Sequence, residues 1–209
     1  LLPLPNFELE VPGDFSSAAF LITAACLVPG SDLEINGVGL NPLRTGLLDV
    51  LQEMGASLEV ETTASDPEPV GTIRVKSGQL KATSVSGELI PRTLDELSLV
   101  ALAATQADGT TVVKDAEELR VKEADRIAVL ASGLRTVGAE VEEFSDGFAV
   151  TGPSRLHGGL VDPDGDHRMA LGFAVAGLIA SDPVTITGWE CSRISFPEFE
   201  EDLANLRAE

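Results

Sequence analysis

The densest group of charged side chains in this sequence is residues 120–126 (RVKEADR), which contain three cations and two carboxylates. A strand-like apolar run, residues 109–114, comes before it, and apolar residues at helical spacing follow it from Ile127. The charges are therefore expected where a strand leads into the N-terminus of a helix. Free backbone N–H groups and the helix dipole favour anions at such a junction. The added Lys122 and Arg126 make it a candidate binding site for phosphate or carboxylate.

Glu123 lies among these cations and adds a second kind of chemistry. A carboxyl group in such surroundings can transfer protons once a ligand closes over it and redistributes its charge partners. A purely structural interpretation fits the same spacing, with a solvated first helical turn in which Glu118 and Lys122 form an i,i+4 ion pair. Both interpretations stay open at this point.

Composition sets the limits of the fold and of the partners. A chain of 209 residues with 44% hydrophobic content can bury a substantial core, as one large domain or two small ones. The formal net charge is −20, from 34 acidic and 14 basic residues. That balance argues against the broad basic surface that nucleic-acid binding requires, so we expect no nucleic-acid partner.

No apolar run is long enough to cross a bilayer, because residues 16–28 and 169–180 are both too short. We therefore expect a soluble, cytoplasmic protein with no membrane partner. The chain begins at Leu1 without a methionine, which suggests a fragment or a processed chain. Cys26 and Cys191 are expected to be reduced thiols, and neither has a metal-ligand pattern beside it.

An internal repeat organises the chain. Three Ala-rich segments, apolar nearly all round, are each followed by a short turn and a strand; they are residues 16–28, 94–107 and 167–180. The following strands are expected at residues 32–36, 110–114 and 184–187. A helix that is apolar on every side must be buried.

A second helix of another kind follows each of these strands, with one apolar stripe and a polar opposite face. The stripes are Leu47, Leu51 and Met54; Ile127, Leu130, Leu134 and Val137; and Phe199, Leu203 and Leu206. The first two end in similar text, MGASLEVE and VGAEVEEF, in which Gly55 and Gly138 are expected just after the helix end.

This order predicts an α/β (α+β) domain of three βαβαββ units around a pseudo-threefold axis, with the Ala-rich helices buried centrally. Residues 62–72, rich in proline, glycine and acids, are interpreted as an exposed hairpin loop, and residues 145–147 as its shorter counterpart.

Roughly parallel buried helices would bring their N-termini to one face, where the polar residues of these helices lie. Asp14 and Ser16 are interpreted as N-caps. Arg168 is unusual, because a guanidinium in the first turn opposes the helix dipole and costs up to ~1 kcal/mol unless an anion binds. His167 stands beside it on the same polar edge.

Five segments together resemble the 5-enolpyruvylshikimate-3-phosphate synthase family: PGDFSSAAF, LDELSL, EELRVKEADRI, GDHRMALGFAVAGL and ECSRISFPEFEEDL. The likeness runs in order along nearly the whole chain but covers one of that family's two domains. It implies the enolpyruvyl transferase fold, with residues 1–209 as a single domain that forms half of a two-domain enzyme. Helix N-termini would then face a cleft between the domains.

The resemblance implies transfer of the enolpyruvyl group of phosphoenolpyruvate to the 5-hydroxyl of shikimate 3-phosphate, without metal or organic cofactor. Asp95 matches the base toward the hydroxyl, and Glu123 matches the group that exchanges a proton with the methylene carbon. Lys122 would bridge the substrate phosphate, the hydroxyl and the leaving group. Arg126 and Arg168 would clamp phosphoenolpyruvate, and His167 is counted with the substrate-binding residues. The missing second domain is the implied partner.

Two positions depart from the family pattern. Glu118 stands where some members have an asparagine that binds the shikimate phosphate. Ile194 stands where some have a lysine that binds phosphoenolpyruvate, so Arg193, one residue earlier, is the candidate to supply that charge.

Two alternatives remain. The related UDP-N-acetylglucosamine enolpyruvyl transferase has the same fold and donor substrate, although RVKEADR and DHRMA favour the shikimate enzyme. The other alternative is a folded anion-binding module without catalysis.

Overall fold

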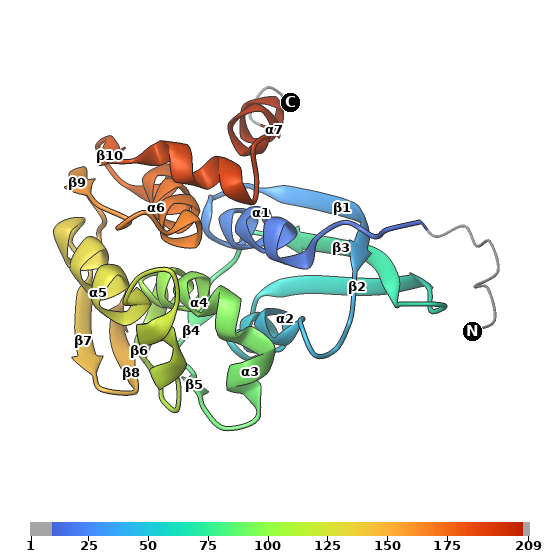
Figure 1. Cartoon of the computed structure of the whole chain (residues 1–209), viewed down its shortest axis with the longest axis horizontal. Coiled ribbons are helices and arrows are strands. Elements are labelled where there is room, and N and C mark those ends of the chain that lie inside the picture. The colour runs from blue at the N-terminus through green and yellow to red at the C-terminus, as the bar shows by residue number, and fades with distance from the viewer. Residues whose placement is uncertain (1–9, 207–209) are drawn as a thin grey trace, which may run out of the picture.

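The structure, a computed structural model, describes residues 10–206. Three helices lie at its centre, α1 (Phe15–Leu27), α4 (Leu97–Ala104) and α6 (His167–Ile179), and each contacts the other two (Figure 1). Nearly all residues of α1 and all of α4 are buried. The prediction of central, Ala-rich helices is confirmed, and their small side chains let the three helices approach closely.

Three sheets surround this centre (Figure 1). In the first, β1 (Asp32–Gly39), β3 (Val70–Lys76) and β2 (Ser57–Ala64) are antiparallel in the order β1-β3-β2. The second has the order β4-β6-β8-β7, and β5 also pairs with β6; its strands are β4 (Leu80–Lys81), β5 (Ser84–Val85), β6 (Ala107–Val113), β7 (Glu140–Phe144) and β8 (Gly147–Gly152). The third pairs β9 (Gly159–Val161) with β10 (Val184–Ile186) in parallel.

The same parallel pairing recurs in all three units. A short segment before each central helix pairs with the strand after it: the Gly13–Val38 bridge, β4 and β5 with β6, and β9 with β10. The second unit shows the full βαβαββ order. The third differs from the expectation, because no hairpin follows its last helix within residues 10–206.

The outer helices are α2 (Gly46–Glu53), α5 (Arg126–Thr136) and α7 (Phe199–Leu206). Gly55 and Gly138 follow α2 and α5 with φ of +87° and +95°, as expected for glycine at a helix end. On α7, Phe199 is buried and packs edge-on against the rings of Phe20 and Phe196. Four short helical segments complete the fold: α3 (Leu89–Thr93), η1 (Leu94–Glu96), η2 (Glu117–Val121) and η3 (Trp189–Ile194).

Several predicted boundaries were wrong. Residues 62–72 are mostly strand, because β2 continues to Ala64 and β3 begins at Val70, which leaves only residues 65–69 for the loop. Consecutive threonines favour the extended conformation, and Thr62 pairs with Gly71 across the hairpin, which outweighs the turn-forming residues nearby. The second central helix starts as η1 and ends at Ala104, and β6 begins at Ala107 because it pairs there with Leu80.

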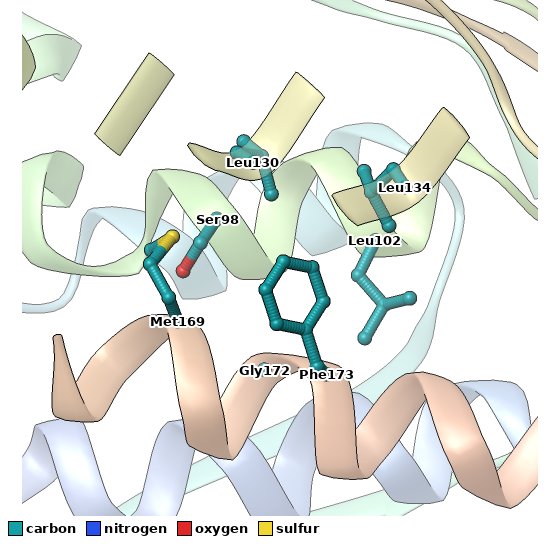
Figure 2. Close-up of a pocket in the computed structure, with 7 residues that line it drawn as sticks. All are labelled: Ser98, Leu102, Leu130, Leu134, Met169, Gly172 and Phe173. Atoms are coloured by element: carbon teal, nitrogen blue, oxygen red, sulfur yellow. The ribbon is translucent and has the colours of Figure 1, made fainter. Parts of the chain in front are cut away.

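A close packing contact joins α5 to α6 beside a small cavity of about 10 Å³ (Figure 2). A Cβ atom on Gly133 of α5 would lie 2.1 Å from Cζ of the Phe173 ring, so only glycine allows this approach. Gly172 of α6 also lines the cavity, but a Cβ atom there would have no neighbour within 4 Å. The buried Ser98 hydroxyl faces the same space without a hydrogen-bond partner among the described residues.

None of the helices in residues 10–206 has the length and apolar character needed to cross a bilayer. Cys26 and Cys191 are both free thiols, as expected.

Candidate functional site

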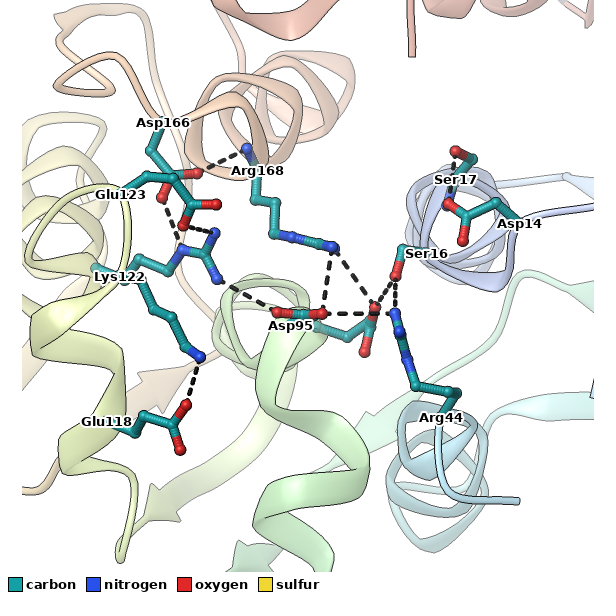
Figure 3. Close-up of polar contacts among 12 residues, drawn as sticks. Asp14, Ser16, Ser17, Arg44, Asp95, Glu118, Lys122, Glu123, Asp166 and Arg168 are labelled. Carbon is teal, nitrogen blue, oxygen red and sulfur yellow. Dashed lines mark hydrogen bonds and ion pairs between the residues drawn. The ribbon is translucent and has the colours of Figure 1, made fainter. Parts of the chain in front are cut away.

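The N-termini of the three central helices meet at one face, which is the arrangement that the repeat predicted (Figure 3). Asp14 caps α1 by accepting from the Ser17 N–H, and Asp166 caps α6 by accepting from the N–H groups of Arg168 and Met169. The interpretation of Ser16 as a cap was wrong. Ser16 lies inside the helix, and its hydroxyl donates to Oε1 of Glu96, 2.6 Å away.

Asp95, at the start of the α4 segment, lies at the centre of the polar cluster (Figure 3). Its Oδ1 is 3.5 Å from Nη1 of Arg126. Its Oδ2 is 3.3 Å from Nη2 of Arg168 and 3.4 Å from Nη2 of Arg44. The side chain is still 31% exposed, so three guanidinium groups surround a carboxylate that solvent or a ligand can reach.

Arg126 is the first residue of α5, and only 3% of its side chain is exposed. Besides Asp95 it contacts two carboxylates: its Nε donates to Oδ2 of Asp166 at 2.7 Å, and its Nη2 to Oε2 of Glu123 at 2.6 Å. Its position is therefore fixed from three sides. Glu123 is half exposed and points into the same cluster.

Arg168 lies in the first turn of α6 and contacts Asp95 and Glu96, at 3.3 and 3.6 Å. These two carboxylates supply the negative charge that offsets the repulsion between its guanidinium and the positive end of the helix dipole. The unfavourable dipole interaction expected from the sequence is therefore already compensated within the protein.

Two members of the cluster were given no role in the site from the sequence, although Glu96 was expected with Asp95 at the same polar face. Glu96 is buried, and burial raises the pKa of its carboxyl to about 7, although the Ser16 hydrogen bond and Arg168 act in the opposite direction. Its signal was a second carboxylate at the start of an otherwise apolar helix. Arg44 precedes α2 by two residues, close to the repeat position that Arg126 occupies at the start of α5. Comparing the repeats position by position could have identified it.

Lys122 and Glu118 form the ion pair that the structural interpretation anticipated. They lie on η2 and the segment after it instead of an α-helical turn. Arg120 has a structural role, because it binds Asp125 and Glu143 and thereby ties the junction to β7. Asp125 in turn caps α5 by accepting from the Ala128 N–H.

His167 is buried at the first position of α6, and burial lowers its pKa, with a further contribution from Arg168. The lowered pKa favours the neutral imidazole. Arg193 is exposed on η3 and makes no ion pair within residues 10–206, so it stands apart from the connected cluster. Its neighbour Ile194 is 73% exposed.

Every cation of the cluster has a carboxylate partner. Arg44 contacts Asp95, Lys122 contacts Glu118, and Arg126 and Arg168 each contact at least two carboxylates. An anionic ligand can therefore exchange places with these carboxylates. The site can bind anions and hold proton-transfer groups beside them, and the two functions are coupled because the same ion pairs serve both.

A sequence model of the family described as EPSP synthase (3-phosphoshikimate 1-carboxyvinyltransferase) matches residues 3–203. The chain is 52% identical to a 3-phosphoshikimate 1-carboxyvinyltransferase of Synechococcus sp. over 209 aligned residues, covering 97% of this chain and 48% of the relative. It is 50% identical to that of Thermotoga sp., covering 96% of this chain and again 48% of the relative.

Two solved structures share the fold. EPSP synthase from Acinetobacter baumannii superimposes with a TM-score of 0.89 at 40% identity, over 93% of this chain and 46% of that one. The enolpyruvyl transferase NikO from Streptomyces tendae gives 0.73 at 19% identity, over 91% and 42%, which shows likeness of fold alone. The chain spans about half the length of these relatives. It belongs to the EPSP synthase family.

Proposed function

We propose that this chain supplies one half of an active site that transfers the enolpyruvyl group of phosphoenolpyruvate to the 5-hydroxyl of shikimate 3-phosphate and releases phosphate. The observation that carries the proposal is Asp95 surrounded by Arg44, Arg126 and Arg168 where three helix N-termini meet. A base beside several cations suits a reaction in which a hydroxyl loses its proton close to two anionic substrates. The relatives are named as 3-phosphoshikimate 1-carboxyvinyltransferases, which supports the same reaction.

In the proposed reaction the hydroxyl oxygen bonds to C2 of phosphoenolpyruvate while its proton moves to Asp95. Glu123 gives a proton to the methylene carbon, which becomes a methyl group. In the second step the bond between C2 and the phosphate oxygen breaks, the phosphate leaves with the proton that Asp95 took from the hydroxyl, and Glu123 takes a proton back from the methyl group to restore the double bond. Glu123 is half exposed and directed at the cluster, which suits a group that must meet substrate.

Arg126 and Arg168 are proposed to bind phosphoenolpyruvate by exchanging their carboxylate partners for the anionic groups of the substrate. The carboxylate and phosphate of phosphoenolpyruvate would replace Asp95 and Glu123 as partners of Arg126 and Arg168, and Lys122 would turn from Glu118 toward substrate phosphate. Exchange would free the two carboxylates for proton transfer at the moment substrate binds. Arg193 makes no ion pair with these residues within residues 10–206, and its role toward phosphoenolpyruvate stays a prediction.

The other half of the site is proposed to come from a second domain, because residues 1–209 match only half of their relatives. Clamping substrate between two facing surfaces would exclude water and bring in further cations. Without that surface, we expect the isolated chain to fold and to bind phosphate weakly, roughly in the millimolar range, because a few charged contacts survive. It should not catalyse transfer.

A folded anion-binding module without catalysis remains the second candidate, and the match to only half the length of the relatives favours it for the chain alone. A UDP-N-acetylglucosamine enolpyruvyl transferase is a third, tested by the same experiment. Phosphate release is measured with phosphoenolpyruvate and either shikimate 3-phosphate or UDP-N-acetylglucosamine, first with the chain alone and then with the complementary half added.

Turnover with shikimate 3-phosphate that appears only when both halves are present supports the proposal. Turnover with the nucleotide sugar instead would replace the acceptor substrate. Turnover by the chain alone would show that the second half is not needed. Absence of turnover in every mixture would favour the anion-binding module without catalysis.

A further inference from the structure

Glu96 has no part in the proposed chemistry, yet it is among the most buried charged side chains of the described chain, at 1% exposure. It follows Asp95 directly and ends η1, so the two carboxyl groups lie on adjacent residues but differ in surroundings. Asp95 reaches the exposed side of the cluster, whereas Glu96 lies beneath it. A carboxyl group in such a place costs free energy unless its neighbours compensate.

The neighbours of Glu96 connect it to two guanidinium groups of the site. Its Oε1 lies 3.6 Å from Nη1 of Arg168 and accepts the hydroxyl hydrogen of Ser16 at 2.6 Å. The Ser16 oxygen accepts in turn from Nη2 of Arg44 at 3.0 Å. Arg168 and Arg44 are the two arginines that contact Oδ2 of Asp95. Glu96 therefore supports, from below, both cations on one side of Asp95.

We propose that Glu96 is a positioning residue of the transferase site. It directs two guanidinium groups toward the anion that binds beside Asp95: that of Arg168 by direct contact, and that of Arg44 through the Ser16 hydroxyl. This inference rests on the proposed function. The Arg168 side chain is long, so a fixed carboxyl group beside it restricts the orientations that its guanidinium adopts before substrate binds.

The charge of Glu96 adds a dependence on pH. The groups that face it are Asp95 on its own segment, Ser16 on α1, Arg44 before α2 and Arg168 on α6. Burial raises its pKa to about 7, so near neutral pH it exists in both forms. As the pH rises, the carboxylate attracts Arg168 more strongly and competes with the substrate anion for it.

The test uses the complete transferase, formed by this chain and its complementary half, with Glu96→Ala and Glu96→Gln. Glu96→Ala should raise the KM for phosphoenolpyruvate about tenfold or more, the scale of a lost charged hydrogen bond, with a much smaller change in kcat. Glu96→Gln keeps an acceptor oxygen for Ser16 beside Arg168 and should restore KM to within about threefold of the starting value. Ser16→Ala removes the hydroxyl that joins Glu96 to Arg44 but leaves the contact between Glu96 and Arg168, and should have an intermediate effect.

The second readout separates positioning from a structural role. The ratio of KM for the unsubstituted enzyme to KM for Glu96→Gln should rise about two- to fivefold from pH 6 to pH 8, the scale of a partly exposed ion pair. Titration of the substrate phosphates cancels in this ratio.

An unchanged KM for Glu96→Ala, with loss only of folded protein, would overturn the proposal. If Glu96→Ala does not fold, the pH ratio decides, and a ratio that is constant from pH 6 to pH 8 would overturn it. Absence of turnover by the unsubstituted enzyme with shikimate 3-phosphate would refute the proposed function instead, and the two failures are therefore distinct.

Discussion

Nε of Arg126 lies 2.7 Å from Oδ2 of Asp166, and the two side chains are 3% and 0% exposed. This pair joins the first residue of α5 to the N-cap of α6, across 40 positions of the sequence. It holds the N-termini of these two helices next to each other, and both face the cluster around Asp95 (Figure 3).

Replacing Asp166 by Asn should destabilise the protein by about 3 kcal/mol, because it leaves Arg126 without its fully buried charge partner. The cost stays at the low end of the range for a broken buried pair, since Glu123 and Asp95 still contact Arg126. Asn still caps α6, so the loss reports the charge. Asp14→Asn, at the exposed cap of α1, is the matched control and should change the free energy of unfolding by less than about 0.5 kcal/mol. Urea unfolding of both variants measures the difference, and equal effects would contradict the importance of the buried pair.

Glu123→Gln in the two-domain enzyme should lower kcat by about two or more orders of magnitude, as expected for loss of a general acid and base. Binding of shikimate 3-phosphate should change little, because the proposed role is toward the other substrate. Glu142→Gln changes an exposed carboxylate on β7 and should leave turnover unaffected. Steady-state kinetics and calorimetric titration check both statements. Near-normal turnover of Glu123→Gln would remove Glu123 from the mechanism.

Arg168→Ala should weaken phosphoenolpyruvate binding by about 1.5 to 3 kcal/mol. The sequence alone suggested that this change would leave folding intact, but the structure shows that Arg168 compensates Asp95 and the buried Glu96. We therefore expect a lower melting temperature as well. The loss should be larger at pH 8 than at pH 6, because only ionised Glu96 needs the cation. Arg168→Lys should be intermediate in binding, since lysine keeps the charge without the planar fork. An equal thermal loss at both pH values would show that Glu96 is not involved.

Glu96 also predicts how stability depends on pH. Its pKa is raised in the folded state from the ordinary 4.5 to about 7. The folded state thus prefers the protonated form, and the stability present below pH 4.5 is lost as the pH rises to about 7, by up to about 3 kcal/mol. Glutamine does not titrate. Glu96→Gln should therefore gain stability relative to the unsubstituted chain across this window, with a constant difference above it. Thermal melts from pH 5 to pH 8 in phosphate-free buffer test this, and a difference that is flat across the window would refute the raised pKa.

Gly172, which lines the cavity of Figure 2, and Gly133, which faces the Phe173 ring, should respond in opposite directions to alanine. Gly172→Ala adds a methyl group to the middle of α6 where nothing lies within 4 Å, and should stabilise the protein by about 0.5 to 1 kcal/mol through lower chain entropy and better helix propensity. Gly133→Ala would meet the Phe173 ring at 2.1 Å and should destabilise by about 1 to 3 kcal/mol. Chemical denaturation of the two variants gives the comparison. A loss in Gly172→Ala equal to that in Gly133→Ala would mean that the space beside Gly172 is not free.

Much of the fold could be predicted from the sequence because its signals are local. An Ala-rich helix that is apolar all round has to be buried, and three of them, each followed by a strand and a one-sided helix, require a layered repeat. Parallel burial of the central helices brings their N-termini together, so Asp95 and Arg168 could be assigned to one face from the chain order, whereas the resemblance to the family added Glu123 and Arg126 to the same site. Strand ends were less predictable, because pairing partners such as Leu80 and Ala107 decide where a strand begins.

The pairing within the site was decided only by the tertiary structure. Ser16 has the side chain and position of a helix cap, but its partner is Glu96, 80 residues away. Arg44 carries no local signal beyond its place before a helix, and it joins the cluster because α2 lies next to the start of α4. Arg193 has the right charge near the right motif and yet lies outside the connected cluster. The residue type determines what a charged side chain can bind. Its partner depends on which helix ends meet, and the packing of the apolar helix faces determines which ends meet.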